Sequence, residues 1–167
     1  STTPIIDDLV AQVGGERIAH LSLMDNTVDP HSYELVKGDD EKFSVAQVVF
    51  YNGLGLEHSA GLTKQLSSHP NGVALGDAIR LKDPSLILHD RGQVDPHIWL
   101  DVALWENSVD PIVAGLKAAD PAGSDYYDAR GKRVKEELLG LDRWIQNKLK
   151  AIPPEKRYLV TSHDAFN

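Results

Sequence analysis

The chain contains no cysteine among its 167 residues, which limits the chemistry available to it. Without thiols it has no disulfide, no thiolate nucleophile, no iron–sulfur cluster and no cysteine-type zinc finger. Any bound metal must therefore be held by imidazole and carboxylate side chains. The missing cysteines do not define the compartment.

Long apolar runs and an excess of positive charge are also missing. No stretch of about 18 apolar residues predicts a transmembrane helix, and no signal peptide is visible, although a mature or trimmed chain would show neither. The net charge of −8 and the pI near 5.3 argue against binding to nucleic acid or to an anionic membrane surface. The length fits one ordinary domain, or a domain with a piece of another.

The chain does have a repeated Asp-Pro-His tripeptide, at residues 29–31 and 95–97, and a further histidine between a serine and an aspartate, His163. Proline restricts its own φ and pushes the preceding aspartate toward extended geometry, so each tripeptide presents its imidazole from a stiffened loop. A ligating histidine usually donates its other ring N–H to a carboxylate or carbonyl, and the aspartate can accept this bond. His31, His97 and His163 are therefore the predicted metal ligands.

A histidine by itself is weak evidence for a metal. His20, His58, His69 and His89 occur elsewhere with no special frame, and a lone histidine is more often a surface residue or a satisfied core residue than a ligand. The repeated frame is what favours ligation by His31 and His97.

The order of the predicted elements favours an α/β fold. A threonine cap and Pro4 start the first helix, and Gly14 and Gly15 end it. Because no strand precedes this cap, we expect further residues before Ser1. Strands that alternate with helices predict a parallel sheet, with ligands bound beyond the carboxyl ends of the strands. The expected order is helix 4–13, strand 18–24, helix 38–46, strand 48–51, helix 57–68 and strand 73–75.

The second half of the chain is expected to be mostly helical, at 101–118 and at 121–150. In the later segment, apolar residues recur at threes and fours, as a single buried face requires. About 30 residues at 1.5 Å each span roughly 45 Å, which suits a strut between two lobes. A strand at 158–162 follows and places His163 at its exit. The residues of the predicted buried face are Val134, Leu138, Leu141, Ile145 and Leu149.

These elements divide the chain into three parts. Residues 1–120 are predicted to form an α/β metal-binding lobe. One loop leaves strand 18–24 and another precedes residue 97, and together they bring two histidines to one edge of the sheet of this lobe. Residues 121–152 are predicted to form a long linking helix. Residues 153–167 are predicted to be the first strand of a truncated second lobe.

Four short motifs stand in order along the chain: DPHSYE at 29–34, NGLGLE at 52–57, DPHIWLD at 95–101 and SHDAF at 162–166. They resemble the successive signature motifs of the metal-binding solute-binding proteins of bacterial ABC importers, the TroA-like group. The resemblance implies two α/β lobes joined by one long helix, with a divalent Mn, Zn or Fe ion held between them. It also implies a periplasmic or surface-anchored protein that delivers the ion to an ABC-type membrane permease.

The resemblance implies His31 and His97 as ligands from the first lobe and His163 as the third. The fourth is usually an aspartate that lies beyond the end of this chain. Asp95 and Glu34 are then candidates to hydrogen-bond the ligating rings without contacting the ion.

The same resemblance assigns the other motif residues. Glu57 is expected to support the loop, and Trp99 and Tyr33 are expected to pack the loops without touching the ion. Zinc-specific members often carry a histidine-rich acidic loop between the first two ligand motifs. Here the stretch 76–94 holds only His89, which favours manganese, iron or mixed use.

Two other classes of function compete with metal capture. Three histidines with an open fourth position also suit a zinc-dependent hydrolase or hydratase, in which Asp164 or Glu34 would act as general base. An adhesion or interaction protein has no independent support in the sequence. We expect no catalytic residues and no enzyme. The edge of the predicted strand at 158–162 could pair with a second chain to form a dimer.

Overall fold

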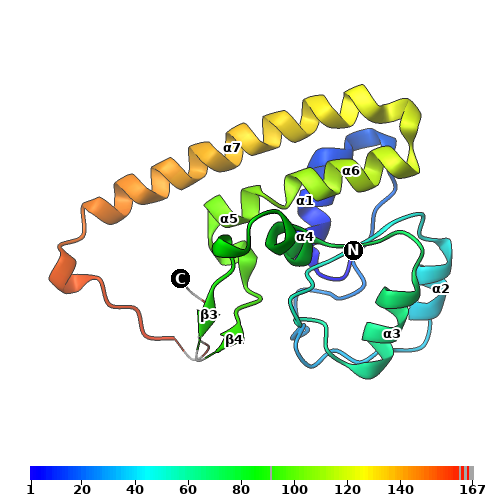
Figure 1. Ribbon diagram of the computed structural model, residues 1–167, viewed down its shortest axis with the longest axis horizontal. Helices are drawn as coiled ribbons and strands as arrows, with labels where there is room; N and C mark the ends of the chain where they lie inside the picture. Colours follow the sequence, from blue (N-terminus) through cyan, green and yellow to red (C-terminus); the bar gives the residue numbers. More distant parts are fainter. Residues whose placement is uncertain (91, 162, 164, 166–167) are drawn as a thin grey trace.

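The computed structural model in Figure 1 describes residues 1–90, 92–161, 163 and 165. Helices dominate, and the strands are short. The helices are α1 (Pro4–Gly14), α2 (Asp39–Val45), α3 (Ala60–Ser68), α4 (Leu75–Lys82), α5 (Val102–Glu106), α6 (Val109–Ala119) and α7 (Ser124–Lys150). The strands are β1 (Val49–Tyr51), β2 (Gly72–Ala74), β3 (His89–Asp90) and β4 (Gln93–Val94). Short 3-10 turns lie at Gly15–Arg17, Pro84–Leu86, Ile98–Leu100, Pro121–Gly123 and Pro154–Lys156.

Helix α1 begins and ends where the sequence predicts. Pro4 occupies its first turn directly after Thr3, and the helix stops at Gly15, whose φ of 54° suits a residue without a side chain. A Cβ at Gly15 would also collide with the hydroxyl of Tyr126. The Thr3 side chain forms no cap bond, so the start of the helix depends on backbone geometry and on the proline.

The parallel sheet is confirmed in type but is small. Strands β1 and β2 pair in parallel, with Val49 opposite Gly72 and Tyr51 opposite Ala74. The predicted strand 73–75 is shifted by one residue, because Leu75 already begins α4. Strands β3 and β4 form an antiparallel hairpin in the segment before residue 97, which was predicted to be a loop.

The predicted strand at 18–24 is wrong, because the structure has no strand there. The backbone is nevertheless positioned as a strand would be, since the Ser1 ammonium donates to Leu21 O at 2.9 Å and Leu23 N–H donates to Ser1 O at 2.8 Å. This alternation is that of a parallel ladder. It ends after Thr2, where α1 begins, so the partner is too short to define a strand.

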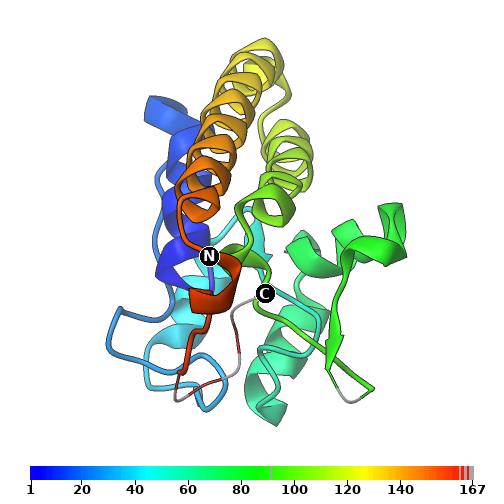
Figure 2. The same cartoon turned by 90° about the vertical axis from the view of Figure 1, so that its left-hand side faces the viewer.

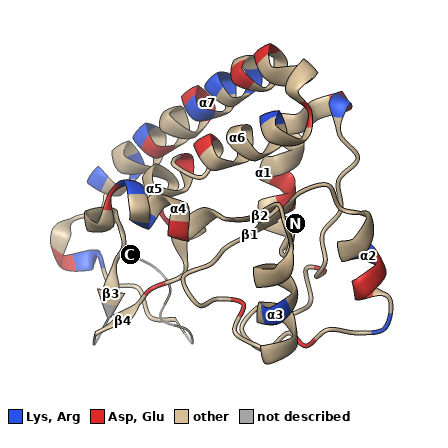
Figure 3. Ribbon diagram, turned by 45° about the vertical axis from the view of Figure 1, so that its right-hand side comes forward, with Lys and Arg blue, Asp and Glu red and all other residues tan. Residues whose placement is uncertain are grey.

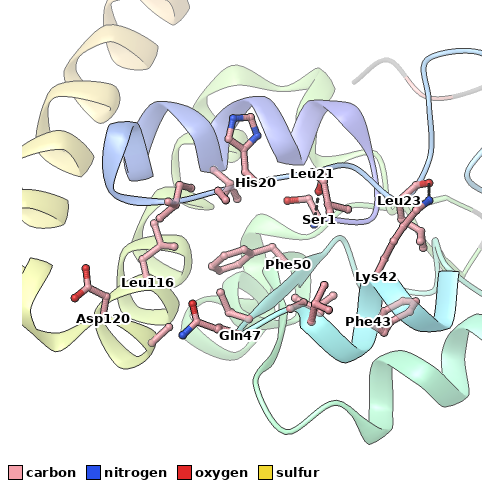
Figure 4. A pocket seen from close by; sticks show the side chains of 18 of the residues that line it. Ser1, His20, Leu21, Leu23, Lys42, Phe43, Gln47, Phe50, Leu116 and Asp120 are labelled. Atoms are coloured by element: carbon pink, nitrogen blue, oxygen red, sulfur yellow. Dashed lines mark hydrogen bonds between the residues drawn. The ribbon is translucent and has the colours of Figure 1, made fainter. Parts of the chain in front are cut away.

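A cavity of about 340 Å³ lies beside Ser1 and residues 17–21. Its lining, shown in Figure 4, includes Ser1, Leu21, Phe50 and Leu116 and is mostly apolar. Successive residues of β1 direct their backbone groups to opposite sides, so Val49 donates to the β2 side while Phe50 O accepts from Thr2 N–H.

The main core lies between the sheet and the helices α1, α4, α5, α6 and α7, which Figure 1 and Figure 2 show stacked together. Phe50, Ile112 and Tyr127 are among its fully buried side chains. A second apolar cluster, which includes Met24 and Leu62, lies under α2 and α3.

Helix α7 has 27 residues, or about 40 Å at 1.5 Å per residue, so the long helix is confirmed. Its single buried face is confirmed only in the first half. Val134 is 1% exposed and belongs to the main core, whereas Leu141 is 44% exposed and Trp144 is 58% exposed. Figure 1 shows why, since α7 runs back along α6 and continues beyond both α6 and α5. Acidic and basic residues are mixed along its length (Figure 3). No described helix is long and apolar enough to cross a membrane.

The predicted strand at 158–162 is also wrong for the residues that the structure describes. Residues 158–161 form no strand, and Ser162 lies outside the described residues. Val160 is 94% exposed, and Tyr158 and Leu159 are exposed as well. Their β-branched and aromatic character favours a strand, but a strand also needs a neighbour for its backbone hydrogen bonds.

Candidate metal centre

The three predicted histidines converge at one place. His31 Nε2 lies 3.1 Å from His97 Nε2, and His163 Nε2 lies 2.9 Å from the same atom. One nitrogen from each ring can be chosen so that all lie within 4.8 Å of one another. Two nitrogens bound to one ion at about 2.1 Å would lie about 3.0 to 3.4 Å apart, for right-angled and tetrahedral geometry respectively. The two short separations are thus near those of ligands that share an ion.

Each histidine comes from a loop. His31 follows a turn in the long connection between Arg17 and α2, His97 directly precedes the turn Ile98–Leu100, and His163 lies in the segment after α7. The three are joined only by tertiary structure, because helices and the sheet separate them along the chain. They line an open cleft together with Trp99 and Ala165.

The two Asp-Pro-His tripeptides adopt the same local turn. In each one the aspartate Oδ1 accepts the backbone N–H of the histidine two residues later, at 2.9 Å in both cases. This is the side-chain turn that aspartate forms readily, and proline holds the intervening φ. The backbone hydrogen bond from His31 also lowers the pKa of Asp29. The stiffened loops predicted from the sequence are therefore present.

The two tripeptides differ at the imidazole. Asp95 Oδ1 also lies 2.6 Å from His97 Nδ1, so this carboxylate contacts the ring as well as the backbone. Because the carboxylate accepts, Nδ1 of a neutral His97 carries the proton and Nε2 keeps the lone pair that faces the other two rings. The Asp29 carboxylate accepts from the backbone of His31 and from the Ser32 hydroxyl, and its described hydrogen bonds do not include the His31 ring.

Burial separates the ligand candidates. His97 is buried and packs edge-on against Trp99, with ring centroids 5.3 Å apart, whereas His31 is half-buried and His163 is exposed. Burial and the neighbouring His97 lower the pKa of His31, and the opposing effect of Asp29 is smaller. A lowered pKa keeps the His31 ring neutral, which is the form that binds metals.

Glu34 does not take the role predicted for it among the described contacts. It is exposed, and the hydrogen bonds described for the three imidazoles do not include it. Asp164, the other candidate base for a hydrolase, lies outside the described residues. Trp99 packs against a ring as expected.

Tyr33 also has the packing role expected of it. Its hydroxyl donates to the buried carboxylate of Asp39, which also accepts from Val36 N–H and Lys42. Burial raises the pKa of Asp39, but these hydrogen bonds outweigh it and the pKa is lowered overall. The charged carboxylate thereby fixes the loop that follows His31 to the start of α2.

The NGLGLE motif is hydrogen-bonded to the loop that carries His97. Asn52 is fully buried, and its Nδ2 donates to Pro96 O at 2.9 Å. The backbone N–H groups of Asn52 and Gly53 donate to the carboxylate of Glu57, and so does the hydroxyl of Thr2. Burial raises the pKa of Glu57, and these hydrogen bonds oppose the rise. The predicted supporting role of Glu57 agrees with these contacts, while the bond from Asn52 to the ligand loop was not foreseen.

Sequence comparison identifies the family. The model of the family described as ZnuA, zinc-uptake complex component A, periplasmic, matches residues 1–167. The chain belongs to this family. The chain is 40% identical over 167 residues to the metal-binding protein YtgA of Chlamydia trachomatis, and the alignment includes 100% of this chain and 51% of YtgA. It is 35% identical to the manganese-binding lipoprotein MntA of Bacillus subtilis, in an alignment that includes 99% of this chain and 54% of MntA.

Solved structures agree with this assignment. Fe(III)-bound YtgA from Chlamydia trachomatis superposes with a TM-score of 0.92 at 39% identity, covering 98% of this chain and 57% of that one. The periplasmic zinc-binding protein TroA from Treponema pallidum gives a TM-score of 0.89 at 32% identity, with 98% and 59% covered. The predicted α/β fold and the predicted family are thus confirmed. The ZnuA-family chain spans about half the length of the curated relatives it matches.

Proposed function

We propose that the chain captures a divalent transition metal ion as the substrate of an ABC-type importer, and that His31, His97 and His163 bind it. One observation carries this proposal: three imidazoles from distant loops bring ring nitrogens within 4.8 Å of one another. A cation bound by their lone pairs would hold three neutral imidazoles at such separations, and imidazole suits Zn and Fe(II), while an added carboxylate would suit Mn.

Family membership supports the rest of the proposal. Relatives are named as metal-binding or manganese-binding proteins and as lipoproteins, and the family description is periplasmic. We therefore place the protein outside the cytoplasm, where it would deliver the ion to a membrane permease. Within a two-lobed whole, residues 1–120 would be the metal-binding lobe, 121–152 the linking helix and 153–167 the start of the second lobe. A carboxylate of that lobe would complete the ligand set.

The identity of the ion depends on the ligand set and on supply. Raw affinity of nitrogen and oxygen ligands favours Zn over Fe and Mn, so selectivity must come from geometry. The names of the relatives include zinc, manganese and Fe(III). We propose one divalent ion per chain.

A catalytic role has less support than capture. A hydrolase needs a general base near the metal-bound water, and Glu34 is exposed and makes no described contact with the triad. Asp95, the carboxylate nearest His97, already accepts the Nδ1 proton of that ring. We therefore propose a binding protein and not an enzyme.

Titration calorimetry of the metal-free chain with Zn²⁺, Mn²⁺ and Fe²⁺ tests the proposal. We expect one ion per chain, and we expect His97→Ala to weaken binding by at least about 100-fold, since it removes a ligand whose outer partners alone are worth 10- to 100-fold. His20→Ala is the control, because this ring pairs with Asp7 away from the triad. Equal affinity of His97→Ala and the parent chain would refute the site.

A further inference from the structure

His58 lies beside the triad without belonging to it. It stands between Leu56 and α3, its side chain is exposed, and its ring centroid is 6.3 Å from that of His31. The rings of the triad have centroids 4.8 to 5.4 Å apart. Two imidazoles that share one zinc ion at about 2.1 Å have centroids about 5 Å apart. In the position described, His58 is therefore roughly 1 Å farther from His31 than two rings on one ion would be, so the two rings can share an ion only after His58 changes its rotamer.

The hydrogen bonding of His58 leaves one ring nitrogen suited to a metal. Its Nδ1 lies 3.2 Å from the carbonyl oxygen of Leu56. A carbonyl oxygen can only accept, so in the neutral ring Nδ1 carries the proton and Nε2 has the lone pair. His97 has the same tautomer, since its Nδ1 donates to Asp95.

The backbone on both sides of His58 is held in place. The buried carboxylate of Glu57 accepts from Asn52 and Gly53, and Thr63 Oγ1 donates to the carbonyl oxygen of Glu57 at 3.0 Å. Ser59, on the other side, is buried at the start of α3. Because the imidazole is exposed on a fixed backbone, a rotamer change is enough to move the ring, and exposed side chains change rotamer in picoseconds to nanoseconds.

His58 is placed on the His31 side of the centre. Among the described residues its ring contacts His31, and no ring contact with His97 or His163 is described. His31 is half-buried, whereas His97 is buried. An ion that arrives beside His58 therefore meets His31 before it meets His97.

We propose that His58 is an auxiliary metal ligand that, together with His31, first binds the incoming divalent ion and then releases it to the triad. The proposal rests on the proposed function of the triad. Nε2 of His58 displaces a water from the hydrated ion, and Nε2 of His97 later displaces His58. Both rings stay neutral, and only metal–ligand bonds are exchanged.

Stopped-flow mixing of the metal-free full chain with Zn²⁺, followed by a fluorescent zinc chelator in competition, measures the association rate. We expect His58→Gln to lower the association rate constant about tenfold, within the range by which mutations at one site change such rates. The stoichiometry stays at one ion per chain, because the triad is intact. His58→Gln keeps a polar, exposed side chain, and thermal unfolding of both proteins verifies the fold.

His89→Gln is the matched control. His89 is also exposed, and its Nδ1 lies 3.1 Å from the carbonyl oxygen of Ile87, two residues earlier. Among the described residues, no ring contact joins His89 to the triad. We expect this variant to associate at the parental rate. An unchanged rate in His58→Gln, or an equal decrease in His89→Gln, would overturn the role of His58.

A second measurement tests the contact directly. We expect the ¹⁵N signal of His58 Nε2 to shift or broaden in the parent chain at Zn²⁺ concentrations below one equivalent. A signal that stays unchanged throughout the titration would also contradict the proposal. Failure of the parent chain to bind Zn²⁺ at all would instead refute the proposed function, so the two failures are distinguishable.

Discussion

The two Asp-Pro-His tripeptides provide an internally matched test of how a carboxylate prepares a ligand. Asp29 and Asp95 form the same turn with the backbone N–H of their histidines, at 2.9 Å each, but Asp95 also holds the His97 ring at 2.6 Å. Asp29→Ala therefore removes the turn and a bond from the Ser32 hydroxyl, whereas Asp95→Ala removes the turn and the bond that orients the ring.

The expected effects differ in size. Losing a carboxylate that orients a ligating histidine typically lowers metal affinity by about 10- to 100-fold, which corresponds to about 1.4 to 2.7 kcal/mol of binding free energy. We expect Asp95→Ala to fall in this range. We expect Asp29→Ala to lose less affinity than Asp95→Ala, because the Asp29 carboxylate bonds to the backbone of His31 and to Ser32 and does not orient the ring.

Competition with a chromophoric zinc chelator at pH 7.5 measures both affinities on one scale. Asp95→Asn separates geometry from charge, since its amide oxygen can still accept both bonds while the negative charge is lost. We expect its affinity between those of the parent and of Asp95→Ala. A loss in Asp29→Ala that equals or exceeds the loss in Asp95→Ala would refute the reasoning that the ring contact matters.

Two further predictions concern stability. Glu57→Gln should destabilise the fold by about 1 to 3 kcal/mol, because one amide cannot accept every hydrogen bond that the carboxylate takes from Thr2, Asn52 and Gly53. The raised pKa of Glu57 means that the folded state binds a proton more readily than the unfolded state. The contribution of this proton to stability is therefore full below the ordinary pKa of about 4.3 and is lost as the pH rises through the raised pKa. Urea unfolding between pH 4 and pH 8 should show this decline in the parent and not in Glu57→Gln, and identical pH profiles would contradict it. In α7, Val134→Ala should lower the free energy of unfolding by about 2 kcal/mol and Leu141→Ala by less than about 0.5 kcal/mol, since only Val134 is buried. Equal decreases in thermal or urea unfolding would show that the outer half of the helix is packed.

The prediction of the ligand triad depended on features that are local in the sequence. Proline and aspartate before His31 and His97 control the backbone within three residues, and the structure forms both turns. The start and end of α1 were predictable for the same reason, since Pro4 and Gly15 act on their own φ angles.

The errors concern segments whose state depends on a neighbour. Residues 18–24 and 158–161 have strand-like composition, but a strand forms only where another segment satisfies its backbone groups, and composition does not reveal that neighbour. The buried face predicted for the outer half of α7 is wrong for a similar reason: the apolar period of Leu141 and Leu149 is present, but α7 extends beyond α6 and α5, which cover only its first half.

The sequence alone determined the types of ligand and the turns that carry them, because missing cysteines and short-range dihedral constraints need no knowledge of distant residues. Tertiary structure alone decided that Glu34 makes no described contact with the rings, that Asn52 holds the His97 loop, and that His58 stands beside His31 while His89 does not. These contacts join residues far apart along the chain or depend on side-chain direction. They follow from how the helices and loops pack and not from any local propensity.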